Sequence, residues 1–70
     1  MLQDLWKAHV DERIAAKTHV RKLRSGVLEV GVSNDAILEE LNSYLRQDLL
    51  AAIQKSQSDP PIETLKFVKV

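Results

Sequence analysis

Seventy residues, with ten basic and ten acidic side chains, suffice for one small domain but not for a deep catalytic cleft. The chain has no cysteine, which excludes disulfide bonds and thiolate metal sites, and its apolar runs are too short for a membrane-spanning helix. Because no basic-then-apolar leader opens the chain, we expect a cytoplasmic protein without a signal peptide or a membrane partner.

The charges are unevenly distributed. Residues 1–26 hold six basic and three acidic side chains, whereas residues 27–70 hold four basic and seven acidic ones. From Arg13 to Arg24 there are five basic residues, one histidine and no acid. This asymmetry predicts a basic edge on an otherwise neutral domain.

The first predicted element is an amphipathic helix over about residues 2–16. Apolar side chains recur there at steps of three and four residues, with His9 at the margin of the stripe: Leu2, Leu5, Trp6, Val10 and Ile14. Trp6 has the largest apolar side chain of the group, so we expect it to anchor the core.

A β-hairpin is predicted next, over about residues 18–32. Two strand-like segments, 18–23 and 27–32, flank Arg24-Ser25-Gly26, and glycine takes a positive φ at little cost. Alternation places Leu28, Val30 and Val32 on one face of the second strand. In the first strand it places Thr18, Val20 and Lys22 inward, and His19, Arg21 and Leu23 outward. Arg21 and Lys22 are therefore expected on opposite faces, so that the basic residues wrap an edge of the sheet.

A long helix over about residues 36–55 and a last strand over about 62–68 complete the chain. Ser33 or Asn34 can cap the helix, and a continuous apolar stripe follows: Ile37, Leu38, Leu41, Leu45, Leu49, Ala52 and Ile53. The segment 56–61 ends the helix, because its two prolines cannot continue it. In the last strand Leu65 and Phe67 share one face.

This order of elements predicts an α+β fold of two layers, αββαβ, in which two helices cover one face of a three-stranded sheet. The other face has no helix to cover it. It would display Val27, Glu29 and Gly31, together with Thr64, Lys66 and Val68. An open sheet face and an edge strand are both surfaces that can bind a partner.

Patterns of catalytic and metal-binding residues do not emerge from the sequence. His9 and His19 are ten residues apart and lack the spacing of a helical metal site. Glu39 and Glu40 are adjacent on a helix and diverge by about 100°. There is no Gly-x-Ser-x-Gly motif, and two glycines cannot form a phosphate-binding loop. We therefore expect a protein that is not an enzyme and has no metal or cofactor.

The basic stretch is the remaining signal, because phosphate contact requires fixed positive charge and little else. The candidate nucleic-acid-binding residues are Arg13, Lys17, His19, Arg21, Lys22 and Arg24. The alternative is an ordinary solvated edge, whose charges protect the strand from aggregation. Trp6 and Phe67 are expected in the core and Tyr44 on a helix, so base stacking is not expected.

A series of motifs spans nearly the whole chain. Trp6 is followed by Val10 and Ile14-Ala15, then by Leu23-Arg24-Ser25-Gly26-Val27-Leu28-Glu29-Val30, by Glu40-Leu41 and Leu49-Leu50, and by Ile62-x-x-Leu65-Lys66-Phe67. In this order the motifs resemble the DciA-like family of bacterial proteins. The resemblance implies one KH-like domain over residues 1–70. It also implies an accessory role in replication, in which the protein engages the replicative helicase, aids its loading on DNA and binds nucleic acid.

The chain departs from the family pattern at two places. The family usually has a further helical segment before the tryptophan, and here five residues precede Trp6. Asp11 stands where the family usually has a glycine. The chain also lacks the Gly-x-x-Gly loop with which KH domains clamp nucleotides, so we expect electrostatic, sequence-independent contact with DNA.

The sequence thus supports two hypotheses. The first is a non-enzymatic DNA-associated accessory protein that resembles DciA and has a basic hairpin edge and a face for the helicase. The alternative is a protein-interaction module or homodimer that uses the open sheet face or an edge strand and binds no nucleic acid.

Overall fold

The computed structural model describes residues 2–56 and 61–70. Its elements follow the chain as α1 (Leu2–Ala8), α2 (Glu12–Ala16), β1 (Thr18–Arg24), β2 (Val27–Val32), α3 (Asp35–Glu40), a π-helical turn η1 (Leu41–Leu45), α4 (Arg46–Ser56) and β3 (Thr64–Lys69). Of the segment expected to end the long helix, residues 57–60 lie outside the described residues.

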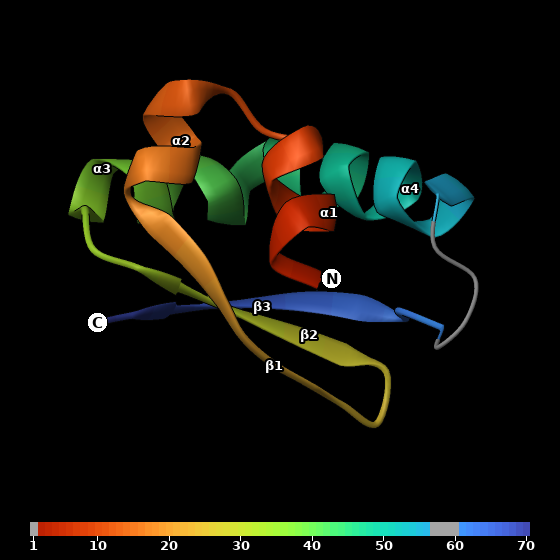
Figure 1. Cartoon of the computed structure of the whole chain (residues 1–70). Coiled ribbons are helices and arrows are strands. Elements are labelled where there is room, and N and C mark those ends of the chain that lie inside the picture. Colours follow the sequence, from red (N-terminus) through yellow and green to blue (C-terminus); the bar gives the residue numbers. More distant parts are fainter. Residues whose placement is uncertain (1, 57–60) are drawn as a thin grey trace.

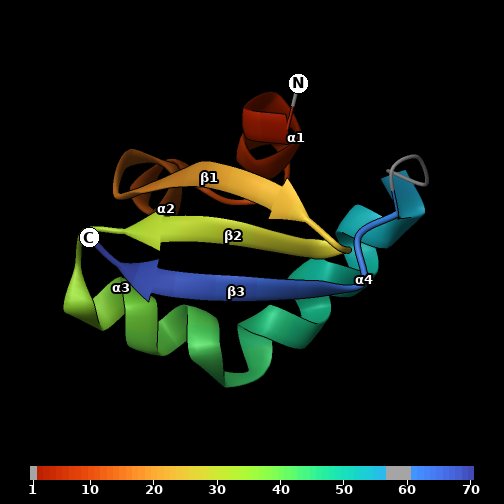
Figure 2. The ribbon, with the colours of Figure 1, turned by 90° about the horizontal axis from the view of Figure 1, so that it is seen from below.

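The sheet has three strands in the order β1-β2-β3 (Figure 1). β1 and β2 are antiparallel, and β2 and β3 are parallel. The helices all lie on one face of the sheet, and Figure 2 shows the other face without a covering helix. The predicted two-layer α+β architecture, compatible with a KH-like fold, is therefore confirmed.

The N-terminal helical segment is divided in two. Asp11 has an extended backbone (φ −76°, ψ 171°), and its carboxylate accepts a hydrogen bond from the Ile14 N–H at 2.9 Å. Aspartate is a favourable N-cap and a poor interior helix residue, so it begins α2 instead of continuing α1. The stretch expected as one helix over 2–16 is thus two short helices, and the second leads directly into β1.

The second helical segment bends at Ser43, where φ is −87° and ψ is −141°. The Ser43 hydroxyl donates a hydrogen bond of 2.6 Å to the Glu40 carbonyl oxygen, a contact of the kind that bends helices. On the two sides of the bend, Leu41 and Ile53 are both fully buried. The bend therefore lets one continuous apolar stripe follow the twisted sheet.

Trp6 joins four elements of the core. Its indole N–H donates to the Thr18 hydroxyl at 2.8 Å, and that hydroxyl donates to the Ile14 carbonyl oxygen at 2.8 Å. The indole ring also lies 5.9 Å from the Phe67 ring between centroids, tilted by 52°. Trp6 thus connects α1 with β1, α2 and β3, which confirms its expected role as a core anchor.

Replacing Thr18 with valine tests this network. Thr18→Val keeps the shape of the side chain but leaves the buried indole N–H without an acceptor, which is expected to cost about 1–3 kcal/mol of unfolding free energy. Denaturant unfolding followed by the fluorescence of Trp6, the one tryptophan of the chain, measures the loss. Thr64→Val on the open face of β3 is the matched control and should change stability little. An equal loss in both variants would contradict a special role for the Trp6–Thr18 hydrogen bond.

Candidate nucleic-acid interface

A β-bulge in β1 determines where the basic side chains lie. The register shifts between Val20, which stands opposite Val30, and Lys22, which stands opposite Glu29. Arg21 is the extra residue, so two residues of β1 face one residue of β2. Beyond the bulge, Leu23 stands opposite the buried Leu28.

The expectation that Arg21 and Lys22 lie on opposite faces is therefore wrong. The extra residue shifts the alternation by one position, which places Lys22 on the open face and Leu23 against the core. Arg21 also lies on the open face, because its side chain reaches over Gly31 to Glu29. The basic residues of β1 thus share a face of the sheet instead of wrapping its edge.

The central and third strands complete this surface. As alternation predicted, Val27, Glu29 and Gly31 share the open face with Thr64, Lys66 and Val68. In the register of the sheet, Glu29 stands between Lys22 of β1 and Lys66 of β3. Lys66 was not among the candidate residues of the sequence. Its place beside the hairpin could have been found by pairing the alternation of the last strand with that of residues 27–32.

Arg21 is held in place by an ion pair. Its Nε atom lies 3.2 Å from Oε2 of Glu29, whose side chain is 14% exposed. A Cβ atom at Gly31 would lie 3.2 Å from Cδ of Arg21, so the absence of a side chain at Gly31 leaves room for the arginine stem. The Arg21 side chain consequently passes close to Gly31 and ends beside Glu29, both on the central strand.

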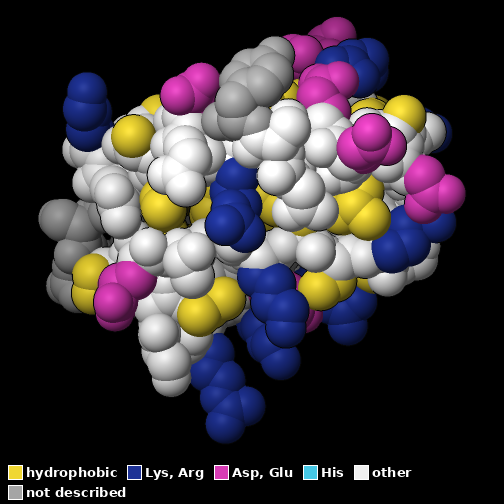
Figure 3. All heavy atoms as spheres, turned by 180° about the vertical axis from the view of Figure 1, so that it is seen from behind, with side chains coloured by type: hydrophobic (Ala, Val, Ile, Leu, Met, Phe, Trp, Pro, Cys, Tyr) yellow, Lys and Arg dark blue, Asp and Glu magenta, His cyan; other side chains and the backbone are white. Residues whose placement is uncertain are grey.

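Three other cations of this face are exposed, and none forms an ion pair with a described residue: Lys22, Arg24 and Lys66. With Ser25, Val27 and Glu29 they line a shallow hollow of about 300 Å³. Figure 3 shows Lys and Arg side chains projecting from the lower, sheet side of the molecule, whereas Asp and Glu gather mainly over the upper, helical layer. We call the residues Arg21, Lys22, Arg24 and Lys66 the basic face.

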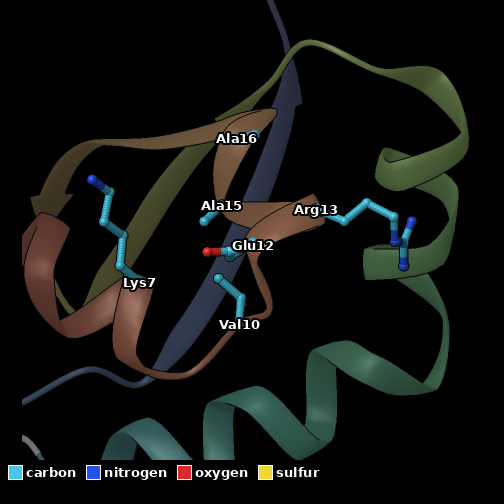
Figure 4. Close-up of a pocket in the computed structure, with 6 residues that line it drawn as sticks. All are labelled: Lys7, Val10, Glu12, Arg13, Ala15 and Ala16. Carbon is cyan, nitrogen blue, oxygen red and sulfur yellow. The ribbon is translucent and has the colours of Figure 1, made fainter.

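The remaining candidates of the sequence lie in different places. His19 stands opposite Gly31 and shares the open face. Lys17 is exposed at the C-terminal cap of α2, just before β1. Arg13 points toward α3 (Figure 4), where its Nη2 atom lies 2.8 Å from Oε2 of Glu40. This hydrogen bond and the charge of Glu40 raise the pKa of Arg13, so its guanidinium stays charged but is neutralised by its partner. Four of the six candidates therefore share the open face, whereas Lys17 lies at the end of α2 and Arg13 lies against α3.

The helical layer offers fewer candidates for a binding site than the open face of the sheet. A hollow between α1 and α2 is lined by Lys7, Val10, Glu12, Arg13, Ala15 and Ala16, and Arg13 turns away from it (Figure 4). Within residues 2–56 and 61–70, no three side chains of the metal-binding types come together. In the same part of the chain, no helix has both the length and the apolar character needed to cross a bilayer.

Comparison with known proteins identifies the family. The family model described as "Dna[CI] antecedent, DciA" matches residues 1–67. A search of curated proteins gave no match. Because the family model spans nearly the whole length of the sequence, this chain belongs to the DciA family.

Proposed function

We propose that this protein is a non-enzymatic accessory factor of DNA replication, which aids loading of the replicative helicase and contacts DNA through the basic face. Membership of the DciA family supports the helicase-loader-like part of this role. One observation carries the DNA part. Four cationic side chains from β1 and β3 share the open face of the sheet with one carboxylate, Glu29, among the residues of the three strands.

The chemistry of the basic face favours contact with phosphates over contact with bases. Lysine and arginine bind phosphate through charge and hydrogen bonds, and each contact releases counterions from DNA. Trp6 and Phe67 are both buried in the core, so neither offers a ring on which a base can stack. We therefore infer sequence-independent binding, which is stronger on the more highly charged duplex than on a single strand.

Removing the unpaired cations of the basic face tests the DNA contact. If Lys22, Arg24 and Lys66 each meet one phosphate, the logarithm of duplex affinity should fall with the logarithm of salt at a slope of about −2.7, and of about −2.1 on a single strand. Changing all three to glutamine should weaken duplex binding by at least about tenfold at low salt and flatten the slope. Fluorescence anisotropy with a labelled duplex measures both quantities.

The matched control removes the same charge from the helical layer. Lys7, Arg46 and Lys55 are exposed on α1 and α4, and changing all three to glutamine should leave most of the binding intact. Equal losses in both triple variants would mean that only net charge matters. Unchanged binding after loss of Lys22, Arg24 and Lys66 would contradict the basic face as the DNA site.

The helicase contact is tested by capture with purified components. We expect the immobilised protein to retain the replicative helicase after nuclease treatment, because a loader must touch the helicase directly. The variant without Lys22, Arg24 and Lys66 should retain the helicase while it loses DNA, if the two partners use different surfaces. Loss of the helicase on nuclease treatment would show that nucleic acid bridges the two proteins and would contradict direct contact.

A second candidate function is protein–protein contact at the free edge of β3. On β1, one backbone group is already bound by α1, since the Val20 N–H donates to the Gln3 side-chain oxygen at 2.7 Å. On β3, Thr64 and Val70 donate toward β2, so the N–H groups of Leu65, Phe67 and Lys69 point outward. No described residue accepts a hydrogen bond from these three groups. An added strand of a second copy or of another protein fits such an edge.

Light scattering without DNA separates the two candidates. A dimer that forms with increasing concentration, in a protein that does not bind a duplex, would favour the β3 edge over the basic face. A monomer that binds the duplex would favour the DNA-associated role.

A further inference from the structure

We propose that Glu29 is an internal competitor of phosphate, which holds Arg21 and thereby limits how tightly the basic face binds DNA. This inference rests on the proposed DNA contact and names a residue that sets its strength. In this proposal Glu29 neutralises part of the positive charge of the basic face. Arg21 is the cation that Glu29 pairs with, whereas Lys22, Arg24 and Lys66 form no ion pair with a described residue.

The position of Glu29 in the sheet is the first argument. It lies on the central strand, so cations can approach it from both neighbouring strands. The bulge places Arg21 and Lys22 opposite it on β1, and the parallel register places Lys66 opposite it on β3. Its side chain is only 14% exposed, so the residues around it shield most of the side chain from solvent.

The geometry of Arg21 is the second argument. Its side chain crosses Gly31 and ends at Glu29, with 3.2 Å between Nε and Oε2. A guanidinium binds phosphate through two parallel hydrogen bonds, and Glu29 lies against Nε, one of the donors that such a contact can use. A phosphate must therefore displace Glu29 before it can bind Arg21 fully. Lys22, Arg24 and Lys66 form no ion pair with the described residues and need no such exchange.

Charge is the third argument. A carboxylate among several cations reduces their mutual repulsion, which favours the folded sheet, but it also repels an approaching phosphate. Replacing Glu29 with glutamine keeps the shape of the side chain and removes both effects. The released Arg21 then adds one phosphate contact, which makes the salt slope steeper by about 0.9.

The experiment is a double-mutant cycle between Arg21 and Glu29, read by duplex anisotropy over a range of salt. Relative to the unmodified protein, Glu29→Gln should bind the duplex about five- to tenfold more tightly at low salt, and its slope should change from about −2.7 to about −3.6. Arg21→Gln alone should change the slope little, because Glu29 already occupies this arginine. The double variant should return to a slope of about −2.7, since the freed cation is then gone.

Glu39→Gln is the matched control. It removes the same charge from an exposed position on α3, in the helical layer, and should barely change either quantity. Because a neutral residue at position 29 can weaken the sheet, circular dichroism checks folding, and Glu29→Thr, with a strand-forming residue, serves as a second variant.

The outcomes distinguish this inference from the proposed function. Equal affinity and slope for Glu29→Gln and Glu39→Gln would overturn the role of Glu29 while leaving DNA binding in place. A tighter Glu29→Gln variant whose gain survives loss of Arg21 would also overturn it, because the gain would then not come from the released arginine. If neither the unmodified protein nor any of these variants binds DNA, both the proposed function and this inference fail.

Discussion

The bulge at Arg21 is the constraint on which the open face of the sheet depends. With uninterrupted alternation, a strand that buries Val20 would also bury Lys22 and expose Leu23. An unpaired lysine is costly to bury, and Leu23 would lose its contact with the core. The extra residue removes both costs, because Leu23 comes to stand opposite Leu28 and Lys22 opposite Glu29. The same shift collects the basic side chains on one surface, so the packing of the core and the charge of the open face have a common origin.

The helical layer and the open face of the sheet differ in their acids more than in their cations. On the helical side, two cations pair with acids of α3, while Lys7, Arg46 and Lys55 form no ion pair with a described residue. Arg13 pairs with Glu40, and Lys69 pairs with Asp35 at the start of α3, each at 2.8 Å. On the open face, Arg21 has a carboxylate partner in Glu29, while Lys22 and its neighbours form no ion pair with the described residues. The chain has no net charge, but six of its acids lie in the helices and only Glu29 lies in a strand, so the open face of the sheet is positive.

Much of the fold could be predicted from the sequence, because apolar periodicity reflects burial directly. The positions that deviate from it are set by hydrogen bonds or by distant partners. Asp11 ends one helix and caps the next, and Ser43 bends another, through side-chain contacts with nearby backbone that periodicity does not describe. The bulge depends on the register with β2, which the first strand alone does not contain. Lys66 is forty-two residues from Arg24 in sequence, so a search for a run of basic residues could not find it.

Among the side chains that the structure describes, no aromatic ring lies on the basic face but one carboxylate, Glu29, does, and both features bear on the kind of DNA contact proposed. A surface that stacks bases or fits them closely gains affinity at the expense of rapid release. Charge alone gives binding that is fast, independent of sequence and easily weakened by salt. In the proposed competition, Glu29 would reduce the affinity further without changing the shape of the surface. For the proposed role in helicase loading, weak and readily reversed phosphate contact would be better suited than tight binding. The pairing of Arg21 with Glu29 is the physical means by which this fold would provide it.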